Sequence, residues 1–136
     1  MQAHQLLDFA LRYTAAWCSQ DAARVASFYA ADGSLAVNGG APAVGQSAIA
    51  EVAQSFMTAF PDLRVSMKKV LGQGDDAEYH WTLTGTSTGP GGTGQRVRIS
   101  GFERWKIGAD GLIASSQGCF DASEYQRQLE RGAREP

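Results

Sequence analysis

The segment "RVRISGFERWKIGADGLIASSQGCF", residues 96–120, predicts two β-strands joined by a turn at "GADG". Alternation with a period of two places Ile99, Trp105 and Ile107 on one face of the first strand. Glu103 falls on this same apolar face. Because an isolated ionised carboxylate is very costly to bury, an inward Glu103 must be hydrogen-bonded to partners, protonated, or at the edge of a wet cavity.

The preceding segment, residues 63–89, predicts a second pair of strands in "LRVSMKKVLGQGDDAEYHWTLTGTSTG", joined through "GQGDD". A shorter strand is predicted earlier, in "SLAVN" at residues 34–38. Four late strands and one early strand predict a curved antiparallel sheet.

Three amphipathic helices are predicted around the early strand, at residues 3–17, within residues 19–33 and at residues 46–60. The apolar stripe of the first consists of Ala3, Leu6, Leu7, Ala10, Tyr13, Thr14 and Trp17. Asp121 begins a short C-terminal helix, with Glu124 three residues later as in a capping box.

Helices at the front and strands behind indicate the α+β class, with the three N-terminal helices packed over one concave face of the sheet. The length of 136 residues is typical of one domain, spanning residues 1–136. A sheet bent over a helical layer predicts a conical cavity between them, where small apolar ligands are usually held.

Composition argues against several functions. The formal net charge is −2, so the sequence does not provide the excess of basic residues that binding to nucleic acids requires. The N-terminal segment has no uninterrupted apolar core and no stretch approaches a membrane span, so a cytoplasmic protein is expected. Cys18 and Cys119 belong to no C-x-x-C pair, and neither a metal nor a redox site is expected.

The order of elements, together with "FPDL" (60–63), "WTLTGTSTG" (81–89), "ADGLI" (109–113) and "FDASEYQRQL" (120–129), resembles the polyketide-cyclase-like (SnoaL-like) branch of the nuclear-transport-factor-2-like superfamily. The resemblance covers nearly the whole chain. It implies a cone-shaped fold that is often dimeric through the sheet. It also implies a pocket that hosts isomerases, cyclases, dehydratases, epoxide hydrolases or no known activity.

The resemblance to the ketosteroid-isomerase branch implies site residues one by one. Tyr13 in "LRYTAAW" matches a tyrosine of the oxyanion hole, and Glu103 in "GFERWKI" stands where a late-strand acid would be. That branch's isomerase is a worked case of such roles. The position of the aspartate base falls on Asn38, which can orient a carbonyl group but cannot accept the proton.

The polyketide cyclases imply a different set, which this chain lacks. Their acid/base aspartate aligns with Gly118, and their late-strand histidine aligns near Arg104. Asp121, three residues beyond Gly118, is explained by its predicted capping role. No Arg-x-Asp pair of the epoxide-hydrolase kind occurs in the sequence.

Further residues are candidates for holding a substrate. The polar substrate-binding candidates are Asn38 and His80, and the apolar substrate-binding candidates are Trp17, Phe56 and Trp105. Structural alternatives remain open at this stage: Asn38 suits the turn into "GGAP", and His80 shares a face with Glu78 that is polar or solvent-facing. Tyr13 can be a core tyrosine, and Glu103 can pair with an arginine or lie at a dimer interface.

The leading hypothesis is an enzyme of the ketosteroid-isomerase or polyketide-cyclase type that acts by proton transfer on a flat apolar carbonyl compound. Tyr13 and Glu103 would be its catalytic residues, and no cofactor or metal is needed for such chemistry. The alternative is a non-catalytic protein that binds a small apolar molecule in the same pocket. A homodimer is expected in either case, and a weaker third hypothesis is a protein-interaction module that uses the open face of the sheet.

Overall fold

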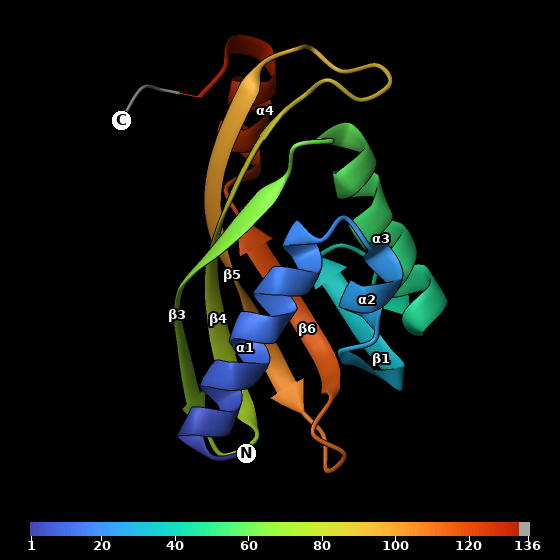
Figure 1. Ribbon diagram of the computed structural model, residues 1–136, viewed down its shortest axis with the longest axis vertical. Helices are drawn as coiled ribbons and strands as arrows, with labels where there is room; N and C mark the ends of the chain where they lie inside the picture. Colours follow the sequence, from blue (N-terminus) through green and yellow to red (C-terminus); the bar gives the residue numbers. More distant parts are fainter. Residues whose placement is uncertain (134–136) are drawn as a thin grey trace.

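The computed structural model describes residues 1–133, which form four helices and six strands (Figure 1). In chain order the elements are α1 (Ala3–Cys18), α2 (Ala22–Ala26), β1 (Tyr29–Val37), β2 (Ala43–Val44), α3 (Gln46–Ala59), β3 (Arg64–Gln73), β4 (Asp76–Thr86), β5 (Arg96–Ile107), β6 (Ile113–Phe120) and α4 (Ala122–Arg131). The predicted α+β class is confirmed. None of the described helices is long and apolar enough to cross a membrane.

The strands form one sheet in the order β2-β1-β6-β5-β4-β3. The two late hairpins are antiparallel as predicted, but β1 lies parallel to β6, and the short strand β2 was not predicted. β1 begins at Tyr29, which the sequence pattern assigned to the second helix. Pairing of Tyr29 with Ile113 on β6 gives this segment hydrogen-bonding partners that a local helical pattern does not reveal.

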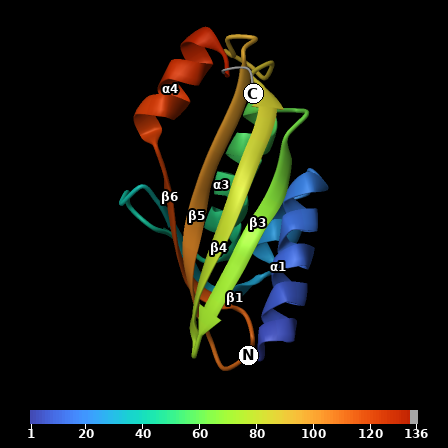
Figure 2. The ribbon, with the colours of Figure 1, turned by 90° about the vertical axis from the view of Figure 1, so that its left-hand side faces the viewer.

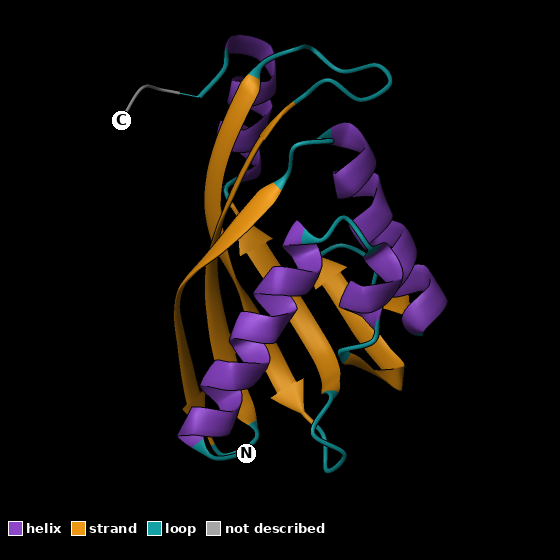
Figure 3. Cartoon of the chain, in the orientation of Figure 1, coloured by secondary structure: helices purple, strands orange, loops and turns teal. Residues whose placement is uncertain are grey.

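The sheet is strongly bent, and its concave side faces the N-terminal helices. Figures 2 and 3 show α1 lying along the bend, whereas α4 lies at one end of the molecule, across β5 from α1. Irregular register in β3 between Met67 and Lys69, and in the β5–β6 pair between Lys106 and Ile107, increases the local bend.

Helix α1 packs on the inner side of the sheet through a stripe that differs from the predicted one. Phe9 and Ala16 are buried with Tyr13 and Trp17, whereas Leu7 is 45% exposed. Close approach of α1 to β3 is possible because Gly72 has no side chain, since a Cβ there would lie 2.5 Å from Cδ2 of Leu6. The buried face of the helix is therefore set by its contact with β3.

The Phe-Pro-Asp turn after α3 connects to the end of β4. Oδ1 of Asp62 accepts a hydrogen bond from the Thr86 amide, and Oδ2 accepts one from the Thr86 hydroxyl, both at 2.7 Å. Partial desolvation alone would raise the pKa of Asp62, but these hydrogen bonds outweigh it and lower the pKa. The turn is thus held to the sheet by an ionised carboxylate.

Helix α4 is attached to β5 where β6 no longer reaches. Asp121 caps the helix as predicted by accepting from the Glu124 amide. Further along, the Gln128 side chain accepts from the Arg98 amide at 2.6 Å and donates to the Arg98 carbonyl at 2.9 Å. One buried amide side chain therefore satisfies both backbone groups of a β5 residue, as a neighbouring strand would.

We expect Gln128→Ala to lower the free energy of unfolding by about 1–3 kcal/mol, because it leaves the partly buried N–H and C=O of Arg98 unpaired. Urea denaturation followed by circular dichroism measures the change. Gln126→Ala is the matched control, since Gln126 lies exposed on the same helix. Equal effects of the two substitutions would contradict the structural role of Gln128.

Candidate functional site

Glu103 lies on the concave face of β5, as the alternation predicts. It is 7% exposed and stands between Tyr79 on β4 and Gly118 on β6, its partners in the sheet register. Its strand neighbours Phe102 and Arg104 point to the opposite face, where Arg104 is exposed. The carboxyl group is therefore held inside the cone by the pleat of a central strand.

The two carboxyl oxygens of Glu103 have different surroundings. Oε1 accepts from Ser116 Oγ at 2.7 Å and from Trp105 Nε1 at 2.9 Å. The hydroxyl groups of Tyr13 and Tyr29 donate to the same oxygen at 3.1 and 3.3 Å. Among the described residues, Oε2 accepts only from Tyr13, at 3.2 Å. Oε1 is thus surrounded by donors, and Oε2 keeps capacity for a further hydrogen bond.

Burial raises the pKa of Glu103 above the ordinary value for a glutamate, although its hydrogen bonds act in the opposite direction. Burial, followed by the nearby charge of Glu103, also raises the pKa of Tyr13 and of Tyr29, so both phenols stay protonated as donors. None of the ion pairs between described residues involves Glu103. The alternative that Glu103 pairs with an arginine is therefore wrong, and its partners are neutral.

A cavity of about 70 Å³ lies between the helices and the concave face of the sheet. Its walls are almost entirely apolar and include Trp17, Phe56, Trp81, Ile99, Phe120 and Tyr125. Glu103 is the one carboxyl group among the described residues that line it, and Gly118 lies beside it on β6. The cavity therefore presents one acid to an apolar space.

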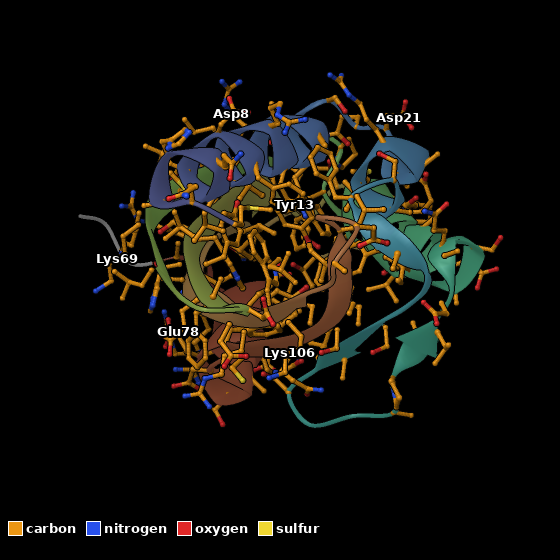
Figure 4. All side chains as sticks on the ribbon, turned by 90° about the horizontal axis from the view of Figure 1, so that it is seen from below. Asp8, Tyr13, Asp21, Lys69, Glu78 and Lys106 are labelled. Carbon is orange, nitrogen blue, oxygen red and sulfur yellow. The ribbon has the colours of Figure 1, made fainter. Side chains whose placement is uncertain are left out.

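The residues predicted to form the site occupy two layers. Trp17 and Phe56 line the cavity, with their rings edge to face at 6.3 Å. Tyr13 and Trp105 contact Glu103 from beneath, and Trp105 stacks on Tyr79 at 4.9 Å. Tyr13 is fully buried between α1 and the sheet, where Figure 4 shows it inside the molecule. Tyr13 and Trp105 thus support Glu103 without forming the cavity wall.

Asn38, which was predicted to bind the substrate, does not lie at the cavity. It is exposed at the end of β1 with a backbone φ of 50°, and its Oδ1 accepts from the Phe120 amide at 2.9 Å. The following residues, Gly39 and Gly40, complete the turn. Asn38 therefore connects β1 to β6 outside the cavity, which is the turn role that its glycine neighbours favour.

His80 also lies outside the cavity, on the convex face of β4. Its Nε2 is 3.1 Å from Glu78 Oε1, and its ring lies 5.6 Å from that of Phe102. Tyr79 and Trp81, the residues on either side, point inward to the cavity. The strand alternation thus decides between the two alternatives and places His80 on the outer, polar face.

Three residues of the site were not singled out from the sequence. Tyr29 arrives from β1, which pairs in parallel with β6, and Ser116 arrives from β6, which pairs antiparallel with β5. The third is Trp81, which lines the cavity from β4. Alternation along β6 places Ser116 and Gly118 on one face, but only the register of β5 with β6 brings them to Glu103.

The described residues contain no group of three or more histidine, cysteine, aspartate or glutamate side chains arranged to hold a metal ion. Sγ of Cys18 donates to the Val65 carbonyl at 3.1 Å and accepts from the Val65 amide at 3.3 Å. The side chains that the described residues supply to this site are one carboxyl group, its hydrogen-bond donors and the apolar wall.

Comparison with known proteins places the chain in a family. The profile of the SnoaL-like polyketide cyclases matches residues 7–129. The chain belongs to this family. No curated protein matches the SnoaL-like chain by sequence.

Solved structures share the fold of this SnoaL-like chain. A protein named as a SnoaL-like polyketide cyclase from Jannaschia sp. CCS1 has a TM-score of 0.82 and 17% identity, with 96% of this chain and 94% of that chain covered. A hypothetical protein with a ketosteroid-isomerase-like fold from Catenulispora acidiphila DSM 44928, solved with trimethylamine, has a TM-score of 0.78 and 18% identity over 90% and 92%. SalBIII, an epoxide hydrolase/cyclase-like enzyme of pyran ring formation in salinomycin, has a TM-score of 0.77 and 16% identity over 91% and 97%.

The raised pKa of Glu103 predicts a specific pH dependence of stability. An unfolded glutamate loses its proton near pH 4.3, roughly, whereas folded Glu103 retains it to higher pH. Its contribution to stability is therefore fully present below pH about 4 and lost as the pH rises through the folded pKa. Glu103→Gln removes this titration while keeping an acceptor oxygen for Ser116 and Trp105.

Urea denaturation of both proteins from pH 4 to 8 measures the difference in their free energies of unfolding. We expect the advantage of the unmodified protein over Glu103→Gln to decrease as the pH rises, with all other titrating groups cancelling between the two. A difference that stays constant, or that grows with pH, would show that Glu103 has no raised pKa.

Proposed function

We propose that this SnoaL-like protein is an enzyme that transfers a proton on a small, flat, apolar carbonyl compound held in the cavity. The observation that carries the proposal is a single carboxyl group, biased toward its neutral form, in the wall of an otherwise apolar cavity. Buried acids of raised pKa in clefts are enriched at catalytic sites. The family provides the fold-level background, since it includes cyclases and isomerase-like enzymes.

The size and lining of the cavity support a small ligand. About 70 Å³ is well below the roughly 300–1,000 Å³ of typical ligand pockets. Aromatic side chains on opposite sides, Trp17 with Phe56 and Trp81 with Phe120, favour a flat molecule. The cavity is about half the roughly 150 Å³ that holds a benzene ring, so a compound with one ring is the largest class that it can take, and only with movement of the aromatic side chains.

Proton transfer falls to Glu103 because Asn38 and His80 lie outside the cavity. The ionised carboxylate takes a proton from the carbon next to the carbonyl group, and the C–H electron pair moves into an enolate. Return of a proton from Glu103, either the same one or a solvent proton that has replaced it, to a carbon of the enolate regenerates the carboxylate and gives the isomer or the original ketone. A pKa above the ordinary value for a glutamate makes the carboxylate a stronger base, which supports this step.

Tyr13 acts on this step as a positioning residue. Its hydroxyl contacts both oxygens of Glu103 from beneath and a second phenol, Tyr29, at 3.0 Å. These contacts hold the carboxyl group at a fixed orientation toward the cavity. The reacting atoms of the ligand would meet Glu103 but not the fully buried Tyr13.

A second candidate function is binding of the same kind of molecule without catalysis. One observation favours it: Oε1 of Glu103 is already the acceptor of four donors, which stabilises the carboxyl group as a fixed structural element. The lining also holds no second carboxyl group among the described residues. The two candidates predict different fates for a bound ketone.

Acetophenone, whose methyl group lies next to its carbonyl carbon, distinguishes the two functions. In D₂O the enzyme should accelerate exchange of the methyl protons for deuterium, observed by ¹H NMR as loss of the methyl signal. Glu103→Gln should reduce this rate by about 100-fold or more, because general acid–base catalysis typically contributes that much. Glu51→Gln, which changes an exposed glutamate on α3, is the matched control and should retain the rate.

Binding of acetophenone without exchange would favour the non-catalytic candidate. Absence of both binding and exchange would overturn the proposal that the cavity holds this class of compound. Exchange that persists in Glu103→Gln would assign the proton transfer to another group.

A further inference from the structure

The indole N–H of Trp81 is the buried donor that the fold leaves unused. Among the buried side-chain nitrogen and oxygen atoms of the described residues, Nε1 of Trp81 is the one without a hydrogen-bond partner. A buried donor without an acceptor costs about 1–3 kcal/mol. Trp105 on the next strand has no such deficit, because its Nε1 donates to Glu103 at 2.9 Å.

Packing fixes the Trp81 ring against Gly101, two residues before Glu103 on β5. Trp81 pairs with Gly101, and a Cβ on Gly101 would lie 2.7 Å from Cζ2 of the indole, so the ring lies directly against the β5 backbone. Cζ2 is bonded to the ring carbon that carries Nε1, so this N–H edge is the one near Gly101. The ring of Phe120 holds the indole edge to face at 6.1 Å.

Gly101 and Glu103 are two residues apart on the same face of β5, which separates them by about 7 Å. Trp81 and Glu103 also line the same cavity. A carbonyl compound of one ring is long enough to contact both groups. The proton transfer proposed for Glu103 creates an enolate oxygen, which requires a hydrogen-bond donor. Glu103 does not supply this donor, because its carboxyl group holds the proton taken from the carbon.

We propose that Nε1 of Trp81 donates a hydrogen bond to the carbonyl oxygen of the ligand, and that Trp81 therefore selects compounds with an acceptor oxygen over hydrocarbons of the same shape. This inference rests on the proposed use of the cavity as a small-molecule site, but it holds for binding without catalysis as well. An anionic ligand is disfavoured, since its charge would meet Glu103 in an apolar space.

Acetophenone and ethylbenzene test the inference, because they have similar shapes and only the ketone has an acceptor. The ¹H–¹⁵N spectrum of the labelled protein contains three indole N–H signals, from Trp17, Trp81 and Trp105. We expect the Trp81 indole proton to move downfield with acetophenone but not with ethylbenzene. Trp81→Phe should identify this signal by its loss.

Affinities from the same titrations supply the second measurement. Trp81→Phe should weaken acetophenone binding by about three- to tenfold, the effect of one neutral hydrogen bond, and should change ethylbenzene binding by less than about twofold. Trp17→Phe is the matched control, because it changes another tryptophan of the wall and should affect both probes alike.

An unmoved Trp81 signal with bound acetophenone, or equal weakening of both probes by Trp81→Phe, would overturn the role of Trp81 and leave the cavity site intact. Failure of both probes to bind the unmodified protein would overturn the proposed function and this inference together. If Trp81→Phe does not fold, Trp17→Phe and Trp105→Phe identify two of the three signals, and the remaining signal of the unmodified protein is that of Trp81.

Discussion

Burial of the Glu103 carboxyl group is the constraint around which the interior of this protein is arranged. Burial of a carboxyl group without hydrogen-bond partners would lower the stability of the fold by roughly several kcal/mol. The donors to Glu103 therefore contribute to the stability of the fold. Those donors come from four elements: Tyr13 from α1, Tyr29 from β1, Trp105 from β5 and Ser116 from β6. Correct placement of the acid therefore depends on the helical layer and on three strands of the sheet at once.

The residues that hold Glu103 in place lie on one side of it, and the cavity that a ligand would occupy lies on the other side. The aromatic side chains beneath Glu103, Tyr13 and Trp105, pack edge to face at 5.2 Å and leave no space for a ligand on that side. The space above Glu103 is apolar and small. A low local dielectric on both sides strengthens every hydrogen bond to the carboxyl group, and it also makes the ionised form costly, which is the physical origin of the raised pKa.

The sequence predicts those parts of the protein that depend on local periodicity. Alternation along β5 places Glu103 inside, and the same alternation along β4 explains why His80 lies outside. Parallel pairing of β1 with β6 joins residues about 80 positions apart, and no local pattern encodes it. Tyr29 therefore could not be assigned to the site, and Ser116 could not be assigned because the register of β5 with β6 is not encoded in either strand alone. Asn38 was assigned to the site although its side chain accepts from the Phe120 amide at the end of β6.

Gly118 gives the cavity wall one position that is open to chemical change. A Cβ there would lie 3.8 Å from Cγ of Glu103 and 3.5 Å from the Ala36 carbonyl oxygen, which are ordinary contact distances, and its φ is not positive. A single substitution can therefore bring a second functional group next to the acid without moving the strands. Residue 118 can therefore change the reaction without changing the residues that stabilise the fold. The hydrogen-bond donors beneath Glu103 stay in place when residue 118 is substituted.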